Sequence, residues 1–139
     1  LVTYRDNADS AFYARLVPAA DGGSVGTSFA VSAASSVSGD VVSSVAWGKD
    51  RYLVTWIDSR NSATTGNDVY GQYINVSGST VGDNFAVNAA SEFQVYPAVA
   101  GNTSAGSFLA TWHYPTVHDN FSGLERNILR ISLYISSCL

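Results

Sequence analysis

This chain contains an internal repeat with a spacing of 56 residues. The block from Val25 to Ser35 recurs from Val81 to Ser91, and the block from Tyr52 to Trp56 recurs from Phe108 to Trp112. Self-similarity at a fixed spacing of this length is typical of proteins that stack copies of one supersecondary unit. The chain is therefore expected to fold as successive copies that pack on one another.

Two partial copies extend the pattern toward both ends of the sequence. Leu1–Asp6 matches Leu53–Asp58, and Asn127–Ile131 takes the place of Asp68–Gln72. The matches divide a single module into a partial unit (residues 1–35), a full unit (36–91) and a second partial unit (92–139).

Each copy predicts four strands. They are represented, from first to fourth, by residues 84–88, 95–100, 108–113 and 68–76. β-Branched and aromatic residues fill these runs, while Gly, Ser, Asn and Asp collect between them. No stretch keeps an apolar period of about 3.6 residues, so no helix of consequence is predicted. The expected fold is all-β, with repeated four-stranded antiparallel units.

The strand around residues 53–57 carries apolar side chains at neighbouring positions, which predicts that both of its faces are covered. Sheets stacked face to face, as in propeller blades, cover a strand in this way, and so does a two-sheet sandwich. The repeat favours an incomplete propeller-like arrangement of about two and a half units, because a propeller typically has blades of four strands. A β-sandwich remains the alternative.

The residues that carry the repeat also resemble a known type. Trp56-Ile57-Asp58-Ser59-Arg60, followed by Asp68-Val69-Tyr70-Gly71-Gln72, is similar to a unit of the β-propeller-like repeats of secreted bacterial and archaeal proteins. The resemblance covers roughly residues 1–114 and weakens in the outer copies, where Tyr4 replaces the tryptophan and Tyr114 replaces the aspartate. It implies a propeller or a related β-repeat assembly. It implies no particular activity, because such repeats serve adhesion, scaffolding and ligand binding alike.

Composition points to a compartment and excludes some partners. The net charge is −4 and the seven basic residues are scattered, which argues against nucleic acid and anionic membranes as partners. No window holds the ~20 unbroken apolar residues of a membrane span. Ser and Thr are abundant and Lys49 is the one lysine, a composition that favours an extracellular or cell-surface protein.

No catalytic constellation is recognisable in the sequence. His113 and His118 match no zinc-binding spacing, and neither a Gly-x-Ser-x-Gly elbow nor a phosphate-binding loop is present. The chain is therefore predicted to be no enzyme and to hold no metal or other cofactor. Calcium in the aspartate-bearing loops is the weaker alternative to a structural role for these carboxylates, because no Asp-x-Asp-x-Asp-Gly run exists.

Four residues are the candidates for ligand binding. Trp56 and Trp112 recur at the repeat spacing inside apolar strands, so they are assigned to the core. Trp47 has no tryptophan counterpart in the next copy and is the better surface candidate. Asp58 and Arg60 are expected to form an exposed ion pair worth about 0–1 kcal/mol. The candidate contacts for a glycan or another ligand are Trp47, Asp58, Arg60 and Asp68.

The sequence also predicts sites for glycosylation and for contacts between chains. Three Asn-x-Ser/Thr sequons offer glycosylation at Asn75, Asn102 and Asn120. An incomplete set of units leaves unpaired strand edges, which invite pairing with another chain. The expected intersubunit edges are Leu1, Val2, Thr3, Tyr4 and Arg5 at one end, and Asn127, Ile128, Leu129, Arg130 and Ile131 at the other.

These observations predict a non-catalytic, structural or adhesive module. It would self-associate into a filament, layer or ring at the cell surface, or join further repeats of the same secreted protein. A lectin-like module that binds carbohydrate is the first alternative, and an accessory domain of a secreted hydrolase is the second.

Overall fold

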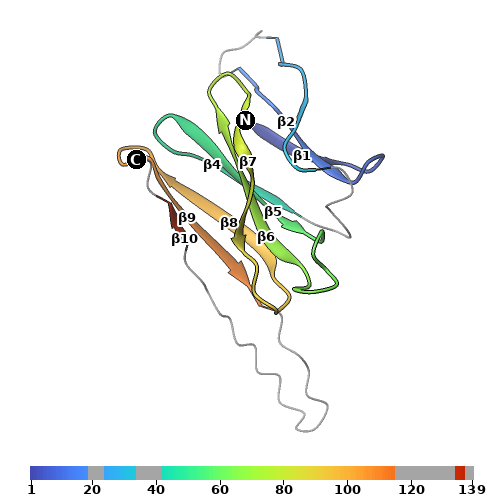
Figure 1. Ribbon diagram of the computed structural model, residues 1–139. Coiled ribbons are helices and arrows are strands. Elements are labelled where there is room, and N and C mark those ends of the chain that lie inside the picture. Colours follow the sequence, from blue (N-terminus) through green and yellow to red (C-terminus); the bar gives the residue numbers. More distant parts are fainter. Residues whose placement is uncertain (19–23, 34–41, 115–133, 137–139) are drawn as a thin grey trace, which may run out of the picture.

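The computed structural model describes residues 1–18, 24–33, 42–114 and 134–136, and every regular element within these ranges is a β-strand (Figure 1). This confirms the prediction of an all-β chain. No helix able to cross a membrane occurs in the described ranges. The strands are β1 (Val2–Asp6), β2 (Ala11–Arg15), β3 (Phe29–Ala30), β4 (Ser43–Trp47), β5 (Arg51–Asp58), β6 (Asp68–Asn75), β7 (Thr80–Asn88), β8 (Val95–Asn102), β9 (Ser107–His113) and β10 (Tyr134–Ser136).

The described strands form three antiparallel sheets. The N-terminal sheet has the order β1-β2-β3, the central sheet β4-β5-β6-β7, and the C-terminal sheet β10-β9-β8. The central sheet is a simple meander in which each strand pairs with the next along the chain. All four of its strands lie within residues 36–91. Within the described residues, the three sheets do not close into a ring.

The strand at residues 80–88 ends the central sheet and does not begin the next one, which differs from the order predicted from the repeat. It pairs with β6 through a tight turn, in which the Asn75 amide donates to the Ser79 carbonyl at 2.9 Å. Gly78 supplies the positive φ of +83° that this turn needs. The segment after Asn88 then passes to β8 in the next sheet. The structural unit therefore runs from β4 to β7.

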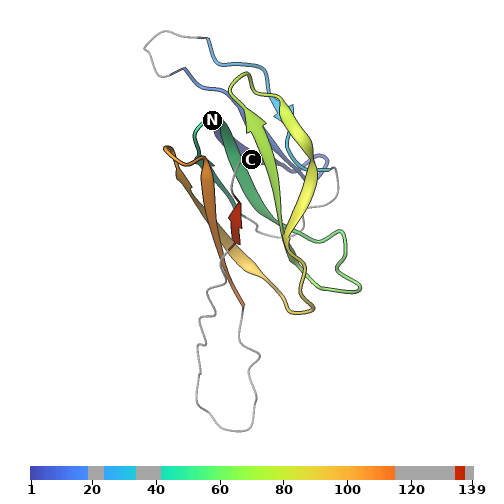
Figure 2. The ribbon, with the colours of Figure 1, turned by 60° about the vertical axis from the view of Figure 1, so that its left-hand side comes forward.

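The central sheet lies between the other two sheets (Figure 2). Against the N-terminal sheet, Val54 and Trp56 of the central sheet belong to the same buried cluster as Phe12, Ala14 and Val31. Successive residues of a strand point to opposite sides, so one face of β5 contributes this cluster. The opposite face of the strand carries Leu53 and Ile57, which are 0% and 5% exposed. Both faces of this strand are covered, as the sequence predicts.

The second interface repeats the arrangement of the first. Val69 and Val87 of the central sheet form a buried cluster with Ala110 and Trp112 of the C-terminal sheet. Ala110 and Trp112 are the repeat counterparts of Val54 and Trp56. Trp56 is 0% exposed and Trp112 is 6% exposed, which confirms that both belong to the core. In both interfaces the tryptophan-bearing face of a sheet meets the sheet that precedes it along the chain.

Candidate functional site

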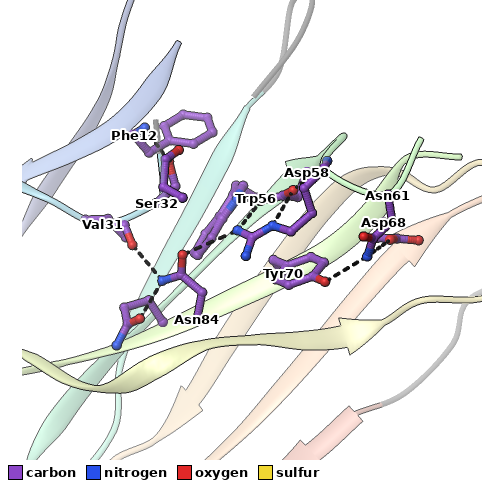
Figure 3. Close-up of polar contacts among 12 residues, drawn as sticks. Phe12, Val31, Ser32, Trp56, Asp58, Asn61, Asp68, Tyr70 and Asn84 are labelled. Carbon is purple, nitrogen blue, oxygen red and sulfur yellow. Dashed lines mark hydrogen bonds and ion pairs between the residues drawn. The ribbon is translucent and has the colours of Figure 1, made fainter. Parts of the chain in front are cut away.

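β5 ends in a carboxylate that is wholly buried. Trp56 and Asp58 are two residues apart on an extended strand, so both side chains lie on the face toward the N-terminal sheet. The Trp56 indole Nε1 donates to Asp58 Oδ2 at 2.9 Å, and the backbone amide of Arg60 donates to Oδ1 at 3.0 Å (Figure 3). The tryptophan-x-aspartate spacing therefore sets up a pairing within one strand.

Arg60 completes the shell around this carboxylate. Its Nε donates to Asp58 Oδ1 at 2.8 Å and its Nη2 to Oδ2 at 2.6 Å, while its guanidinium carbon lies 4.1 Å from the centroid of the Tyr70 ring. The hydrogen bond with Asp58 raises the pKa of Arg60, although partial burial opposes the rise. The sequence predicts that Asp58 and Arg60 form an exposed ion pair. The ion pair forms, but the prediction that it is exposed is wrong, because the side chain of Asp58 is 0% exposed and that of Arg60 is 30% exposed. Breaking such a pair leaves a buried charge, which is far more costly than losing a surface pair.

Gln72 and Asn84 tie the central sheet to the N-terminal sheet. The Asn84 Nδ2 donates to the Val31 carbonyl at 2.9 Å and to Gln72 Oε1 at 2.6 Å, and Asn84 Oδ1 accepts from Arg60 Nη2 at 3.4 Å (Figure 3). Gln72 Nε2 in turn lies 3.1 Å from three carbonyl oxygens at the irregular β6–β7 pairing. The site is thus a polar network that fixes one sheet on another.

Asp68 faces Asp58 directly across the β5–β6 pair, and it is also 0% exposed. Its Oδ2 accepts from Thr65 Oγ1 at 2.9 Å and from Asn61 Nδ2 at 3.5 Å. Asn61 Nδ2 also donates to the Tyr70 hydroxyl at 3.1 Å (Figure 3). These contacts fix the loop between β5 and β6 to the strands that it joins. The second oxygen, Oδ1, has no hydrogen-bond partner among the described residues.

Trp112 lacks the polar partner that Trp56 has. Tyr114 stands at the position of Asp58, and its hydroxyl accepts from Asn88 Nδ2 at 2.8 Å. The buried Nε1 of Trp112 has no hydrogen-bond partner within the part of the chain that the structure describes. The two tryptophans therefore share their packing and differ in their hydrogen bonding.

This difference gives a matched pair of substitutions. Trp56→Phe removes a hydrogen bond to a charged group and leaves Asp58 short of a donor, whereas Trp112→Phe removes an unsatisfied donor. We expect Trp56→Phe to lower the free energy of unfolding by about 2 kcal/mol more than Trp112→Phe does. Urea unfolding followed by circular dichroism measures both losses. Equal losses would show that the indole–carboxylate bond contributes nothing to stability.

An open depression of about 380 Å³ lies beside this network. Its lining is mostly polar and includes no aromatic side chain, so it offers no ring on which a sugar stacks. The residues that line it are Val31, Ser32, Ala33, Arg60, Gln72, Thr80, Gly82, Asp83 and Asn84.

The structure brings together three of the four predicted ligand contacts. Asp58, Arg60 and Asp68 meet at one end of β5, whereas Trp47 packs on Tyr52 at the other, with the two rings 4.7 Å apart. Tyr52 and Asp58 are six residues apart on an extended strand, which separates them by roughly 20 Å. Trp47 therefore shares no site with the aspartates.

The remaining predicted sites are placed as follows. In the described ranges no group of three or more His, Cys, Asp or Glu residues is arranged to hold a metal ion. Asn75 and Asn102 both cap turns: Asn75 Oδ1 accepts from the Ser77 amide at 3.0 Å, and Asn102 Oδ1 from the Ser104 amide. Their glycosylation stays a prediction. Of the expected edges, Val2–Arg5 belong to β1. Outside the described residues lie the sequon Asn120 and the expected edge residues Asn127, Ile128, Leu129, Arg130 and Ile131, as well as His118, for which no site was predicted.

Sequence reasoning missed the amide side chains of the network. Gln72 ends the Asp68-Val69-Tyr70-Gly71-Gln72 run, which occurs once in the chain and could have drawn attention to it. Gln94 is 0% exposed, and its Oε1 accepts from the Val69 amide at 3.0 Å, while its Nε2 donates to the Ala90 carbonyl at 3.2 Å. No signal in the sequence distinguishes this glutamine from a surface residue.

Comparison with protein-family models, curated proteins and solved structures finds no match to this chain.

Proposed function

We propose that this protein is a non-catalytic, extracellular structural module that assembles with copies of itself by stacking its sheets face to face. Further repeats of a longer secreted protein would extend the same stack. In this proposal each sheet acts as a propeller-like blade of up to four strands, with β4 and β8 as the equivalent first strands.

The observation that carries the proposal is the shared orientation of the two sheet interfaces. Trp56 faces the preceding sheet, and Trp112 does the same one unit later. The interface is therefore of the head-to-tail kind, in which one face fits the opposite face of the next copy. Contacts of this kind generate rings when the rotation closes and filaments when it does not.

Within the described part of the chain, no further sheet covers the two faces at the ends of the stack. Phe12 and Ala14 face the central sheet, so the alternating residues Tyr4 and Tyr13 lie on the other side of the N-terminal sheet, with their rings stacked at 6.0 Å. Tyr4 is the counterpart of the buried Trp56. At the other end, Leu109 is 39% exposed, whereas its counterpart Leu53 is fully buried. The counterparts of two residues that are buried in the central sheet are thus half-buried (Tyr4) and exposed (Leu109) in the outer sheets.

The lectin-like alternative has less support. A sugar site is typically built from an aromatic face with a few polar groups beside it. The depression beside Arg60 has no aromatic lining, and Arg60 already serves Asp58. The polar side chains around it join two sheets, which is a structural task.

The test is the mass of the purified chain in solution, measured by light scattering across a range of concentrations, with negative-stain images of the same samples. We expect association that grows with concentration. Tyr4→Asp should weaken it, because a carboxylate would enter the apolar contact between faces. Val76→Asp, at a turn residue that is 64% exposed, is the matched control and should leave the mass unchanged. A monomer at every concentration would rule out assembly between chains.

A further inference from the structure

Trp47 and Gly101 occupy the same position in two successive sheets. Trp47 lies opposite Tyr52 in the β4–β5 pair, and Gly101 lies opposite Phe108 in the β8–β9 pair. Tyr52 and Phe108 are counterparts in the repeat. Residues directly opposite each other in an antiparallel pair point to the same face. Both positions therefore point toward the preceding sheet.

Gly101 leaves room for the first strand of the central sheet. A Cβ at this position would fall on the carbonyl oxygen of Trp47 and would lie 2.7 Å from its carbonyl carbon and 3.2 Å from the Gly48 nitrogen. At this point the backbones of β4 and β8 are in contact, and no side chain fits between Gly101 and the Trp47 carbonyl. A sheet can therefore have a first strand at this place only if the sheet that follows it carries glycine at the position of Gly101.

The N-terminal sheet has no such first strand among the described residues. Its edge strand β1 is the counterpart of β5 and pairs with β2 alone among the described strands. A strand beside β1 would lie over β4 as β4 lies over β8. The side chain of Trp47 points from β4 toward the side on which that strand would lie, and it is partly buried and packed on Tyr52 at an interplanar angle of 57°.

We propose that Trp47 fills the place that a first strand beside β1 would take and thereby blocks the edge of β1 against pairing with β8 of a second copy of this chain. Exposed edges are a hazard that proteins commonly manage by covering them. Here one indole ring would provide the cover. The inference goes beyond face-to-face stacking, because it concerns a strand edge and holds whether or not the chain stacks.

β8 is the occupant that fits this place. The face of a first strand that meets the following sheet carries small side chains, namely Ser44 and Ala46 in β4. The equivalent positions of β8 are Ala98 and Ala100. Transferred to β1 through the repeat, the β8–β9 register places Ala98 opposite Thr3, Val99 opposite Val2, and Ala100 opposite Leu1.

The experiment uses the full chain with Trp47→Gly and a fluorescent peptide of sequence Phe93–Asn102 as the probe. Anisotropy is read at a protein concentration at which light scattering reports one species. We expect the peptide to bind the variant at least about tenfold more tightly than the wild type. Amide exchange should slow, when the peptide is present, at the alternate residues of β1 in the variant whose N–H groups point away from β2. The same peptide with Ala100→Trp is the control and should not bind, because its ring would meet β4.

Several results overturn the proposal. Equal binding to the wild type and the variant would mean that Trp47 is no obstacle, and a folded Trp47→Gly variant that does not bind would mean that no such place exists. Trp47→Ala should not bind the peptide, because its Cβ would still meet the backbone of the incoming strand, so binding by this variant, or tight binding by the wild-type chain, would contradict the proposal on its own. Failure here leaves the light-scattering test of stacking unaffected, because that test addresses Tyr4 and a different surface.

Discussion

Asp58→Ala is expected to lower the free energy of unfolding by about 3–5 kcal/mol, the loss typical of breaking a buried ion pair. The substitution removes the acceptor of four hydrogen bonds from Trp56 and Arg60. It leaves the Trp56 indole N–H buried without a partner. Arg60 can turn partly to water because it is 30% exposed, so the indole and the backbone amide bear most of the loss. Urea unfolding followed by circular dichroism measures the change.

Two further variants separate the causes of this loss. Asp83→Ala also removes one carboxylate, but from an exposed position of β7, and is expected to change stability by no more than about 0.5 kcal/mol. Asp58→Asn keeps an oxygen for the indole and loses the charge, so its effect should lie between the other two. If Asp58→Ala were as mild as Asp83→Ala, the network around Asp58 would not hold the two sheets together.

Gly101→Ala is expected to destabilise the chain by about 3 kcal/mol, the upper end of the usual cost of adding a group where there is no room for it. The added methyl group would fall on the Trp47 carbonyl and lie 2.7 Å from its carbonyl carbon. Both neighbours are backbone atoms of paired strands, so neither can move aside as a flexible side chain does. The central and C-terminal sheets would have to separate along β4 and β8. The measurement is the midpoint and slope of urea unfolding.

Gly26→Ala is the matched control for this substitution. The nearest atom to a Cβ at Gly26 is the Leu16 carbonyl oxygen at 3.5 Å, an ordinary contact. Alanine there should be neutral or slightly stabilising, because it restricts the unfolded chain. Similar losses at both glycines would mean that the close approach of β4 and β8 plays no special part.

The architecture was largely open to prediction because the repeat and the strand chemistry agree. Apolar residues at 53–57 required cover on both faces, and Trp56 and Trp112 recurred where a core position must recur. The sheet to which residues 84–88 belong was harder to predict. The sequence alone does not tell which of two neighbouring segments a strand joins, and here the Asn75–Ser79 turn decides in favour of β6.

The site was predictable only in its local part. Asp58 and Arg60 are two residues apart and could be paired from spacing, but the burial of Asp58 depends on the sheet that packs above it. The bond from Asn84 to the Val31 carbonyl joins residues 53 positions apart and no local pattern announces it. Gln94 was missed for the same reason, because its partner Val69 lies 25 positions away. Long-range partners follow from the stacking of sheets, which a single copy of the repeat does not encode.

The position of the central sheet between two other sheets determines which part of the molecule opens at the lowest free energy. In a stack, stability is approximately a sum of terms for each unit and for each contact between neighbours. Within the described part, opening either outer sheet breaks one contact, whereas opening β5 and β6 breaks two. We therefore expect amide hydrogens of the central sheet to exchange through global unfolding, and those of β1–β3 through a partial opening of lower free energy. Protection against opening is thus expected to be greatest in the central sheet and to fall toward the outer sheets. Each further sheet that packs on an end of the stack would place one more sheet in the protected interior.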